Sequence, residues 1–424
     1  MAEKGISEHG TGMTGNKRLL TLAIVLLSAL LVLGGLIWVN VQFSRNNPGG
    51  NDFLAHYVGT RSLLLEGKSP YSDEVALEIQ RRVFGRPAEP GEIEHRVVYP
   101  LYSILIFAPF ALINNYAIAR VAWMTVMEIA LLGTGYLALK ITSWKPKLII
   151  LAIYYQFAVL WYHGFRAVIN GNAVIVVGFF ITGSLYALSK KNDIAAGILL
   201  TLSTIKPNLV ILYILCILIW CAYQKRYLVI AWFFGSLLFL TIGGMLLIPD
   251  WIIQNLWEIL RYPGYNPPGS IGEVIGLWLP EFSGIIRAGL GIGLGLLWIN
   301  EIWNARRGKF EHILWAACLT LVISQWIGIP TDPGNFVILF TPFVLVLARL
   351  EERWKERSTS YILAILGITL IGLWVLFVTT LNYEYQPMQN SILFFPFPGM
   401  VLIGLYWIKW WVVGSSSAFR QEAL

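Results

Sequence analysis

Residues 195–220 read AAGILLTLSTIKPNLVILYILCILIW, a strongly apolar run that the pair Lys206-Pro207 interrupts near its middle. The whole run has the length that crosses the roughly 30 Å hydrocarbon layer of a membrane. Because proline breaks a helix and restricts the residue before it, the run predicts two short helices that meet at Lys206. Non-helical backbone at membrane depth is tolerated only where it faces protein or a polar cavity, so we expect Lys206 to lie at a polar site.

The rest of the chain has the same character. Of its 424 residues, 57% are hydrophobic and 13% are charged, and the mean hydropathy is +0.65. Apolar runs recur along the sequence, and they predict an all-α polytopic membrane protein of about twelve transmembrane helices. We expect one integral-membrane domain over residues 1–424. The first run, residues 18–42, is too long for a signal peptide and predicts a retained helix.

The distribution of positive charge predicts the orientation in the membrane. Lys17 and Arg18 precede the first helix, which places the N-terminus in the cytoplasm under the positive-inside rule. Placing the later basic clusters inside as well puts both termini in the cytoplasm. The net charge of +7 then needs no nucleic-acid partner. The expected outer segments are about 43–115, 163–171, 204–207, 249–282, 330–335 and 382–392.

The first outer segment, residues 43–115, is the chief departure from a plain helix bundle. This topology requires residues 101–113 to form a re-entrant or juxtamembrane helix, with the true crossing at 116–139. The alternative is a thirteenth span with one basic cluster on the opposite side.

Five basic residues remain outside the cytoplasmic clusters and the first loop, each near the expected outer end of a helix. Two interpretations are open: the side chains reach lipid phosphates, or they face a cavity that binds an anionic, phosphate-bearing substrate. For Lys206 the helix break favours the second interpretation, and for the last two of the five we favour the first. The five are Arg120, Arg166, Lys206, Arg261 and Arg287.

In the order of its motifs along the chain, the sequence resembles glycosyltransferase family 87, whose members are bacterial integral-membrane enzymes of the GT-C fold. The resemblance begins in NDFLAHYVGTRSLLLEGKSPYS (51–72), VVYPLYSILIFAPFALI (97–113) and AIARVAW (117–123). Here the family's Asp-Phe-x-x-Tyr, Gly-x-x-Pro-Tyr and Tyr-Pro-Pro motifs are represented, with Leu101 in place of the second proline of the last. The matching residues are Asp52, Phe53 and Tyr57 (with His56 beside it), Gly67, Pro70 and Tyr71, and Tyr99 and Pro100.

The resemblance continues in the middle of the chain and changes in its last third. Gly171 and Asn172 occupy part of the family's Gly-Gln-x-Asn, and Lys206 stands at the lysine of its Ala-Gly…Lys-x-x-Pro segment. Where the family often has a His pair, this chain has Gly334 and Asn335. That departure bears on contacts to the donor phosphate and on sugar specificity.

The resemblance implies a fold and a reaction. It implies a GT-C-like helix bundle in the bacterial plasma membrane. It also implies transfer of a hexose, typically mannose, from a polyprenyl-phosphate sugar to a lipid or glycan acceptor on the extracytoplasmic side. No cofactor or metal is expected. Asp52 is expected as the catalytic base, with an alternative role as a helix N-cap, where Asp is favoured. The expected substrate-binding residues are His56, Tyr57, Tyr71, Tyr99, Arg120, Arg166, Asn172 and Lys206.

Two functions from other classes remain open. A transporter or flippase of a lipid-linked sugar would show similar halves with broken helices at matching positions, and no such repeat is visible. An inactive subunit of an envelope-polysaccharide complex would keep the fold, and the altered loop at Gly334–Asn335 fits such a role. The sequence has no nucleotide-binding loop or phosphate cradle for a cytosolic sugar nucleotide.

Overall fold

The computed structural model describes residues 15–47, 49–264, 270–329, 331–381 and 390–412, and their regular structure is entirely helical. The first half contains α1 (Gly15–Asn46), α2 (Asn51–Glu66), α3 (Asp73–Phe84), α4 (Ile104–Ala111), α5 (Tyr116–Thr142), α6 (Leu148–Leu160), α7 (Tyr162–Asn170), α8 (Val174–Ser189), α9 (Asp193–Ser203) and α10 (Pro207–Tyr223). The second half contains α11 (Tyr227–Leu247), α12 (Trp251–Arg261), α13 (Ile271–Trp278), α14 (Ser283–Ala305), α15 (Phe310–Trp326), α16 (Phe340–Trp354), α17 (Ser358–Thr380) and α18 (Pro396–Val412). The described part also holds short 3₁₀ helices, of which η1 (Leu101–Ser103) and η4 (Pro333–Leu339) matter here.

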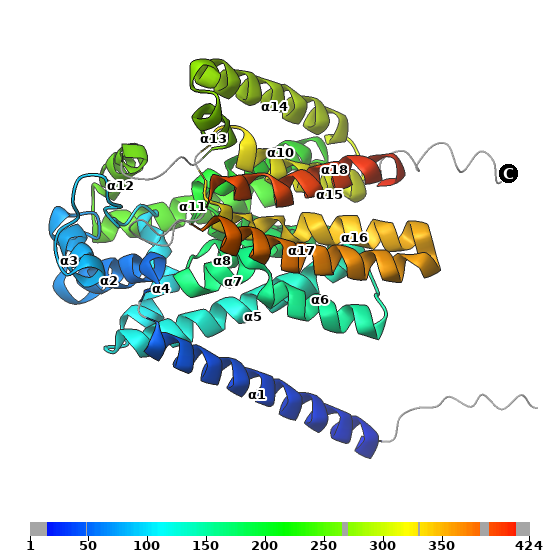
Figure 1. Cartoon of the computed structure of the whole chain (residues 1–424), viewed down its shortest axis with the longest axis horizontal. Helices are drawn as coiled ribbons and strands as arrows, with labels where there is room; N and C mark the ends of the chain where they lie inside the picture. The colour runs from blue at the N-terminus through cyan, green and yellow to red at the C-terminus, as the bar shows by residue number, and fades with distance from the viewer. Residues whose placement is uncertain (1–14, 48, 265–269, 330, 382–389, 413–424) are drawn as a thin grey trace, which may run out of the picture.

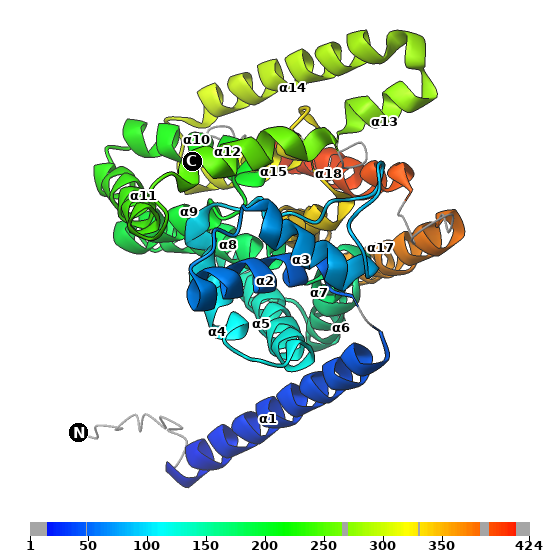
Figure 2. The ribbon, with the colours of Figure 1, turned by 90° about the vertical axis from the view of Figure 1, so that its left-hand side faces the viewer.

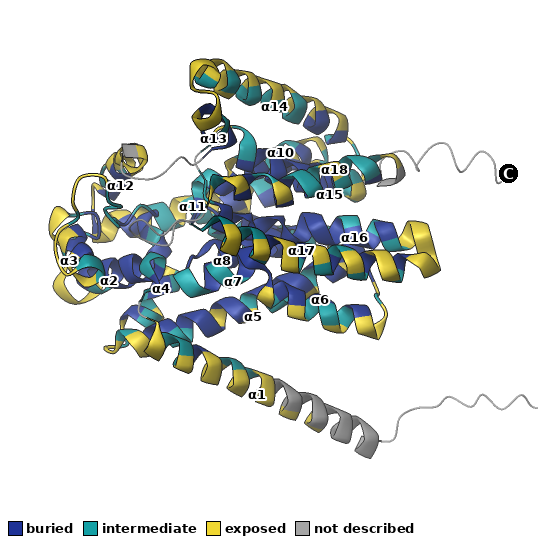
Figure 3. Cartoon of the chain, viewed as in Figure 1, coloured by how far each residue is buried: buried dark blue, intermediate teal, exposed yellow. Residues whose placement is uncertain are grey.

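Several helices have the surface of a membrane protein. On α11 and α14, large apolar side chains such as Phe239, Leu246 and Ile285 are 76%, 82% and 73% exposed. Figure 3 shows exposed residues along α14, while the helices at the centre are buried. Soluble proteins rarely expose continuous apolar surface of this kind. We conclude that the protein is embedded in a membrane.

The expected number of spans is not confirmed. Five helical stretches among the described residues are long and apolar enough to cross a membrane, or six if α6 and α7, bent by 42°, form one span. One of the five contains both α16 and α17, which pack against each other. The count of about twelve came from apolar run length, whereas a straight crossing needs about 20 helical residues. Helices α8, α9, α10 and α15 have only 16, 11, 17 and 17 residues.

The two short helices at the opening motif are confirmed. Helix α9 ends at Ser203 and α10 begins at Pro207, so Lys206 is the residue that precedes the second helix. The interpretation of residues 101–113 is also supported, because η1 and the eight-residue α4 are too short to cross and α5 is a candidate span.

Helices from two of the expected outer segments, 43–115 and 249–282, lie at one end of the bundle. Helices α2, α3 and α12 lie together at the left of Figure 1 and face the viewer in Figure 2. Helix α1 begins and α18 ends at the opposite, right-hand end of Figure 1. This arrangement agrees with termini on one side of the membrane, although which side that is stays a prediction. Most of the expected outer segment 382–392 lies outside the described residues.

A buried ion pair links α3 and α12 to the segment before η1; these elements are called the outer layer here, after the side on which the sequence predicts them. Arg96, in the extended segment before η1, donates to Glu258 of α12 over 2.6 Å, and their side chains are 7% and 5% exposed. Arg96 also pairs with Asp73 at the start of α3 over 2.6 Å. Asn255 of α12 donates to the carbonyl oxygens of Val98 and Tyr99, over 3.0 and 3.2 Å. The segment that leads to Tyr99 is thereby fixed against α12.

Candidate functional site

Two glycines bring Asp52 to the turn between α7 and α8. Gly50 precedes α2 with φ 77°, and a Cβ there would lie 2.7 Å from Nε of Arg120. Gly171 ends α7 with φ 73°, and a Cβ there would lie 2.3 Å from the Cβ of Phe53. Only glycine tolerates both the left-handed backbone and this close approach. The first turn of α2 therefore packs on the turn that carries Asn172.

The helix-cap alternative for Asp52 is wrong. The N-cap residue of α2 is Gly50, which makes no side-chain cap, and Asp52 lies inside the first turn of the helix. Its carboxylate gains from the positive end of the helix dipole but does not cap the helix. Asp52 is partly exposed to solvent.

Lys206 lies at the centre of a polar cluster. The side chain is buried, with 8% of its surface exposed. Its ammonium nitrogen donates to Oδ1 of Asn172 over 2.9 Å and to Oδ1 of Asn335 over 2.7 Å. The same nitrogen lies 5.6 Å from the centre of the Tyr99 ring, within the range of a cation–π contact. The break between α9 and α10 thus faces a polar site, as the sequence predicts.

Asn172 connects this cation to Asp52. Its Oδ1 accepts from Lys206 and also from the backbone N–H of Val174 over 3.0 Å, which fixes the orientation of the amide. With Oδ1 committed, the amide NH₂ is the group that can face the Asp52 carboxylate, and this interaction lowers the pKa of Asp52. Asn172 therefore places a carboxylate and an ammonium on either side of one amide.

The surroundings of Asp52 suit a proton acceptor. Helix α2 lies outside the candidate spans. Burial raises the pKa of Asp52 above its usual 3.8, and the charge of Asp332 raises it further, whereas Lys206, Arg166 and the hydrogen bond from Asn172 act in the opposite direction. A carboxylate with a raised pKa is a stronger base for an alcohol proton than an ordinary surface carboxylate.

Arg166 and Asp332 form the second part of the cluster. Arg166, on α7, donates from Nη1 to the Tyr162 hydroxyl over 3.1 Å and interacts electrostatically with Asp332 and Asp52. Asp332 caps η4, where its Oδ1 accepts from the backbone N–H of Gly334 over 2.6 Å. Asp332 is thus a turn residue, and the turn lies at the site.

Aromatic rings form one wall of the cluster. The imidazole of His56 stacks between Tyr99 and Phe107, with centroid distances of 4.0 and 4.5 Å. Burial lowers the pKa of His56 to about 3, so the ring is neutral. The hydroxyl of Tyr71 donates to the backbone oxygen of Tyr99 over 2.7 Å. Tyr71 thus fixes the position of Tyr99, which faces Lys206.

Two residues of the expected set have structural partners. Arg120 donates to the backbone oxygens of Asn47 and Ile169, over 2.7 and 3.2 Å, and so ties the end of α1 to the end of α7. Tyr57 is 1% exposed and donates to the backbone oxygen of Ile113 over 2.7 Å. A role of either residue in substrate binding stays a prediction.

The sequence did not single out every member of this site. The sequence marks Asn335 only as a departure from a His pair, and no motif marks Asn255, which supports Tyr99. Asn335 is separated from Lys206 by 129 residues, so no local pattern connects them. Asn255 lies on the polar face of the amphipathic α12, which was a usable signal for a helix that packs on the outer layer.

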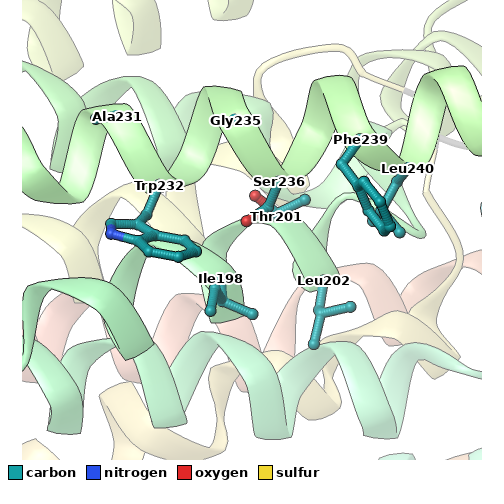
Figure 4. A pocket seen from close by; sticks show the side chains of 9 residues that line it. All are labelled: Ile198, Thr201, Leu202, Ala231, Trp232, Gly235, Ser236, Phe239 and Leu240. Atoms are coloured by element: carbon teal, nitrogen blue, oxygen red, sulfur yellow. The ribbon is translucent and has the colours of Figure 1, made fainter.

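An apolar groove lies on another side of α9. Helix α9 packs against both α8 and α11, and between α9 and α11 there is a cavity of about 550 Å³. Figure 4 shows the side chains of both helices that line it, among them Trp232 and Phe239 on α11 and Ile198 and Leu202 on α9. Its lining contains no charged residue, so the groove lacks the chemistry of the Lys206 cluster.

Comparison with known proteins supports one family. The model for glycosyltransferase family 87 matches residues 98–325. The matched range includes Tyr99, Arg166, Asn172 and Lys206, and excludes Asp52 and Asn335. No curated protein and no solved structure matches the chain.

Proposed function

The chain belongs to glycosyltransferase family 87, and on that premise we propose the reaction that its polar cluster carries out. We infer that it moves a hexose, with mannose as the first candidate, from a polyprenyl-phosphate donor to a lipid or glycan acceptor on the outer side of the bacterial plasma membrane. The observation that carries the proposal is the placement of Asp52 and Lys206 on either side of Asn172.

The proposed step requires one base and one cation. The acceptor oxygen attacks the anomeric carbon, and its new C–O bond forms as the bond from that carbon to the phosphate oxygen breaks. The electron pair of the broken bond leaves with the phosphate, and the acceptor proton passes to the Asp52 carboxylate. Attack opposite the leaving phosphate inverts the anomeric centre. One base is enough, unlike the carboxylate pair of a glycosidase.

Lys206 is the group proposed to hold the leaving phosphate. Negative charge grows on that phosphate as the sugar departs, and a preorganised ammonium stabilises such charge best in a site that excludes water. Its remaining N–H suits a single phosphate oxygen. Arg166, which is held by the hydroxyl of Tyr162 one helix turn earlier on α7, would add a second positive charge near the leaving phosphate. No role is assigned to a metal or cofactor.

The outer layer is proposed to bind the sugar. Tyr99 presents an aromatic face beside Lys206, and His56 stacks on that ring. Aromatic faces and neutral hydrogen-bonding groups suit a neutral hexose. The membrane-embedded helices around the cluster suit a donor whose phosphate is attached to a hydrocarbon chain.

Transfer is tested directly with labelled donor. Purified protein in detergent is mixed with radiolabelled polyprenyl-phosphate mannose and a membrane lipid extract, and released polyprenyl phosphate and new labelled products are separated. The matched control is Asp52→Asn, which keeps the shape of the side chain. We expect product from the wild type alone. Equal product from both proteins would contradict the assignment of the base. Movement of intact donor between leaflets, measured in parallel on protein reconstituted in lipid vesicles, would favour the flippase.

The side of the membrane is tested by cysteine labelling. The three native cysteines, Cys216, Cys221 and Cys318, are buried, so background labelling should be low. Leu77 on α3 is 38% exposed and makes a suitable Leu77→Cys position. We expect an impermeant maleimide to label it in intact cells. Labelling only after permeabilisation would reverse the orientation and the proposed location of the site.

A further inference from the structure

A directed chain of hydrogen bonds runs from α15 to Lys206. Gln325 donates from Nε2 to the backbone oxygen of Leu321 over 3.3 Å. Its Oε1 accepts from the Thr331 hydroxyl over 3.0 Å, and the Thr331 oxygen accepts from Nδ2 of Asn335 over 3.2 Å. Asn335 then accepts from Lys206 over 2.7 Å.

The first member of the chain sets the direction of all the others. A backbone oxygen can only accept, so the amide of Gln325 must present its NH₂ to Leu321 and its oxygen to Thr331. The Thr331 hydroxyl donates its one proton to that oxygen and accepts from Asn335. Asn335 therefore has its NH₂ committed to Thr331 and must present its oxygen to the ammonium. Gln325 is 0% and Asn335 is 3% exposed, so water does not readily replace these partners.

Asn172 fixes the ammonium from its other side. Its oxygen faces Lys206 because it also accepts from the N–H of Val174. Two of the three N–H bonds of the ammonium are thus directed at fixed amide oxygens. Among the described residues, no hydrogen bond uses the third. Fixing two N–H directions of a tetrahedral group also fixes the third.

We propose that Asn335 and Thr331 are positioning residues that aim the third N–H of Lys206 at the leaving phosphate. The inference rests on the proposed function, in which Lys206 binds that phosphate. It assigns the loop at Gly334–Asn335 an indirect role: the loop acts on the phosphate through Lys206 and does not touch it. The loop then joins the last third of the chain to the site carried by the first half.

Binding of a short probe tests the proposal without knowledge of the acceptor. Affinity for farnesyl phosphate is measured on detergent-purified protein, with farnesol as the control that lacks the phosphate. The variants are Lys206→Gln, Asn335→Ala, Thr331→Val and the double variant Lys206→Gln/Asn335→Ala. Thr134→Val is the matched control, since Thr134 is buried and, within the described part of the chain, its hydroxyl bonds to its own helix, at the oxygen of Ala130. Thermal unfolding of each variant is recorded in parallel.

The expected affinities form a double-mutant cycle between Lys206 and Asn335. Asn335→Ala should weaken farnesyl phosphate binding about tenfold, the scale of one lost hydrogen bond to a charged group. Thr331→Val should weaken it less, and farnesol binding should not change. In the Lys206→Gln background, removal of Asn335 should change the affinity by no more than about twofold, because its partner is already gone.

Each other outcome overturns a different statement. If Asn335→Ala weakens binding equally with and without Lys206, then Asn335 touches the phosphate or supports the fold, and the positioning role is wrong. If Asn335→Ala and Thr331→Val bind farnesyl phosphate like Thr134→Val while Lys206→Gln binds it more weakly, the positioning role of the hydrogen-bond chain is wrong. The assignment of Lys206 to the phosphate site is then unaffected. If Lys206→Gln itself binds farnesyl phosphate normally, the proposed phosphate site is wrong. Should Asn335→Ala unfold, Thr331→Val measured with and without Lys206→Gln decides between the first two cases.

Discussion

Two buried cations, Lys206 and Arg120, look alike in the sequence and differ in their surroundings. Each stands alone near one end of an apolar helix, and they are 8% and 2% exposed. Arg120 donates to backbone oxygens at the ends of α1 and α7, and its guanidinium lies 5.5 Å from the Phe43 ring. Lys206 donates to two side-chain amides and lies beside a carboxylate.

The difference shows what makes a buried charge available to a ligand. Backbone oxygens at helix ends require a donor in any state of the protein, so a cation that satisfies them is committed to the fold. The amides of Asn172 and Asn335 are held by other partners as well, so they serve to orient the ammonium. The Lys206 region therefore has the properties of a binding site, and the Arg120 region those of a structural joint.

The largest expected effect comes from Asp52, the carboxylate that only the Lys206 region contains. Asp52→Asn should lower the rate of sugar transfer by about 100-fold or more, the usual scale for loss of a general base. Affinity for farnesyl phosphate should change little, because that probe carries no acceptor. The rate is measured with labelled polyprenyl-phosphate mannose. Wild-type rates from Asp52→Asn would assign the base to another group, with Asp332 as the next candidate.

The second effect tests the phosphate contact. Lys206→Gln removes a charge-assisted hydrogen bond of about 1.5–3 kcal/mol, so transfer should slow by roughly one to two orders of magnitude. Donor binding and the chemical step should both suffer, since the charge on the phosphate grows in the transition state. Arg261→Gln is the control, because Arg261 is a 47% exposed cation with ion-pair distances of 3.5 Å. Equal, small losses from both variants would show that Lys206 has no special role.

Sequence reasoning located the Lys206 region better than its contacts. The break before Pro207 was predictable because proline acts on its own neighbours. The approach of Asp52 to Asn172 depends on Gly171, whose missing Cβ admits Phe53, and a single sequence does not show such a fit. Asn335 reaches Lys206 from the other half of the chain. The count of about twelve spans is not confirmed, because apolar length does not reveal where a helix stops.

The third effect is the pH dependence of transfer. Only the ionised form of Asp52 accepts a proton, so activity should fall as the pH drops through its pKa, about tenfold per pH unit. Because burial raises that pKa above 3.8, the fall should begin at a higher pH than for an exposed carboxylate. His56, with a pKa of about 3, is neutral throughout this range, and His56→Asn should leave the position of the fall unchanged. The residual activity of Asp52→Asn should lack the fall.

The smallest effect on function is expected from Arg120. Arg120→Gln shortens the side chain and removes its bonds to the oxygens of Asn47 and Ile169. A buried acceptor left without a donor costs about 1–3 kcal/mol, so thermal stability should fall. Affinity of the folded protein for farnesyl phosphate should stay within about twofold of the wild type, the size of a coupling between independent sites.

Arg120→Gln and Lys206→Gln each lose one buried positive charge, and their comparison separates charge from placement. If a general positive potential at the outer end attracted the phosphate, both variants would bind farnesyl phosphate more weakly by similar factors. If placement decides, binding falls in Lys206→Gln and stability falls in Arg120→Gln. A loss of affinity in Arg120→Gln without a loss of stability would return Arg120 to the substrate-binding set. The joint between α1 and α7 would then have to form part of the donor site.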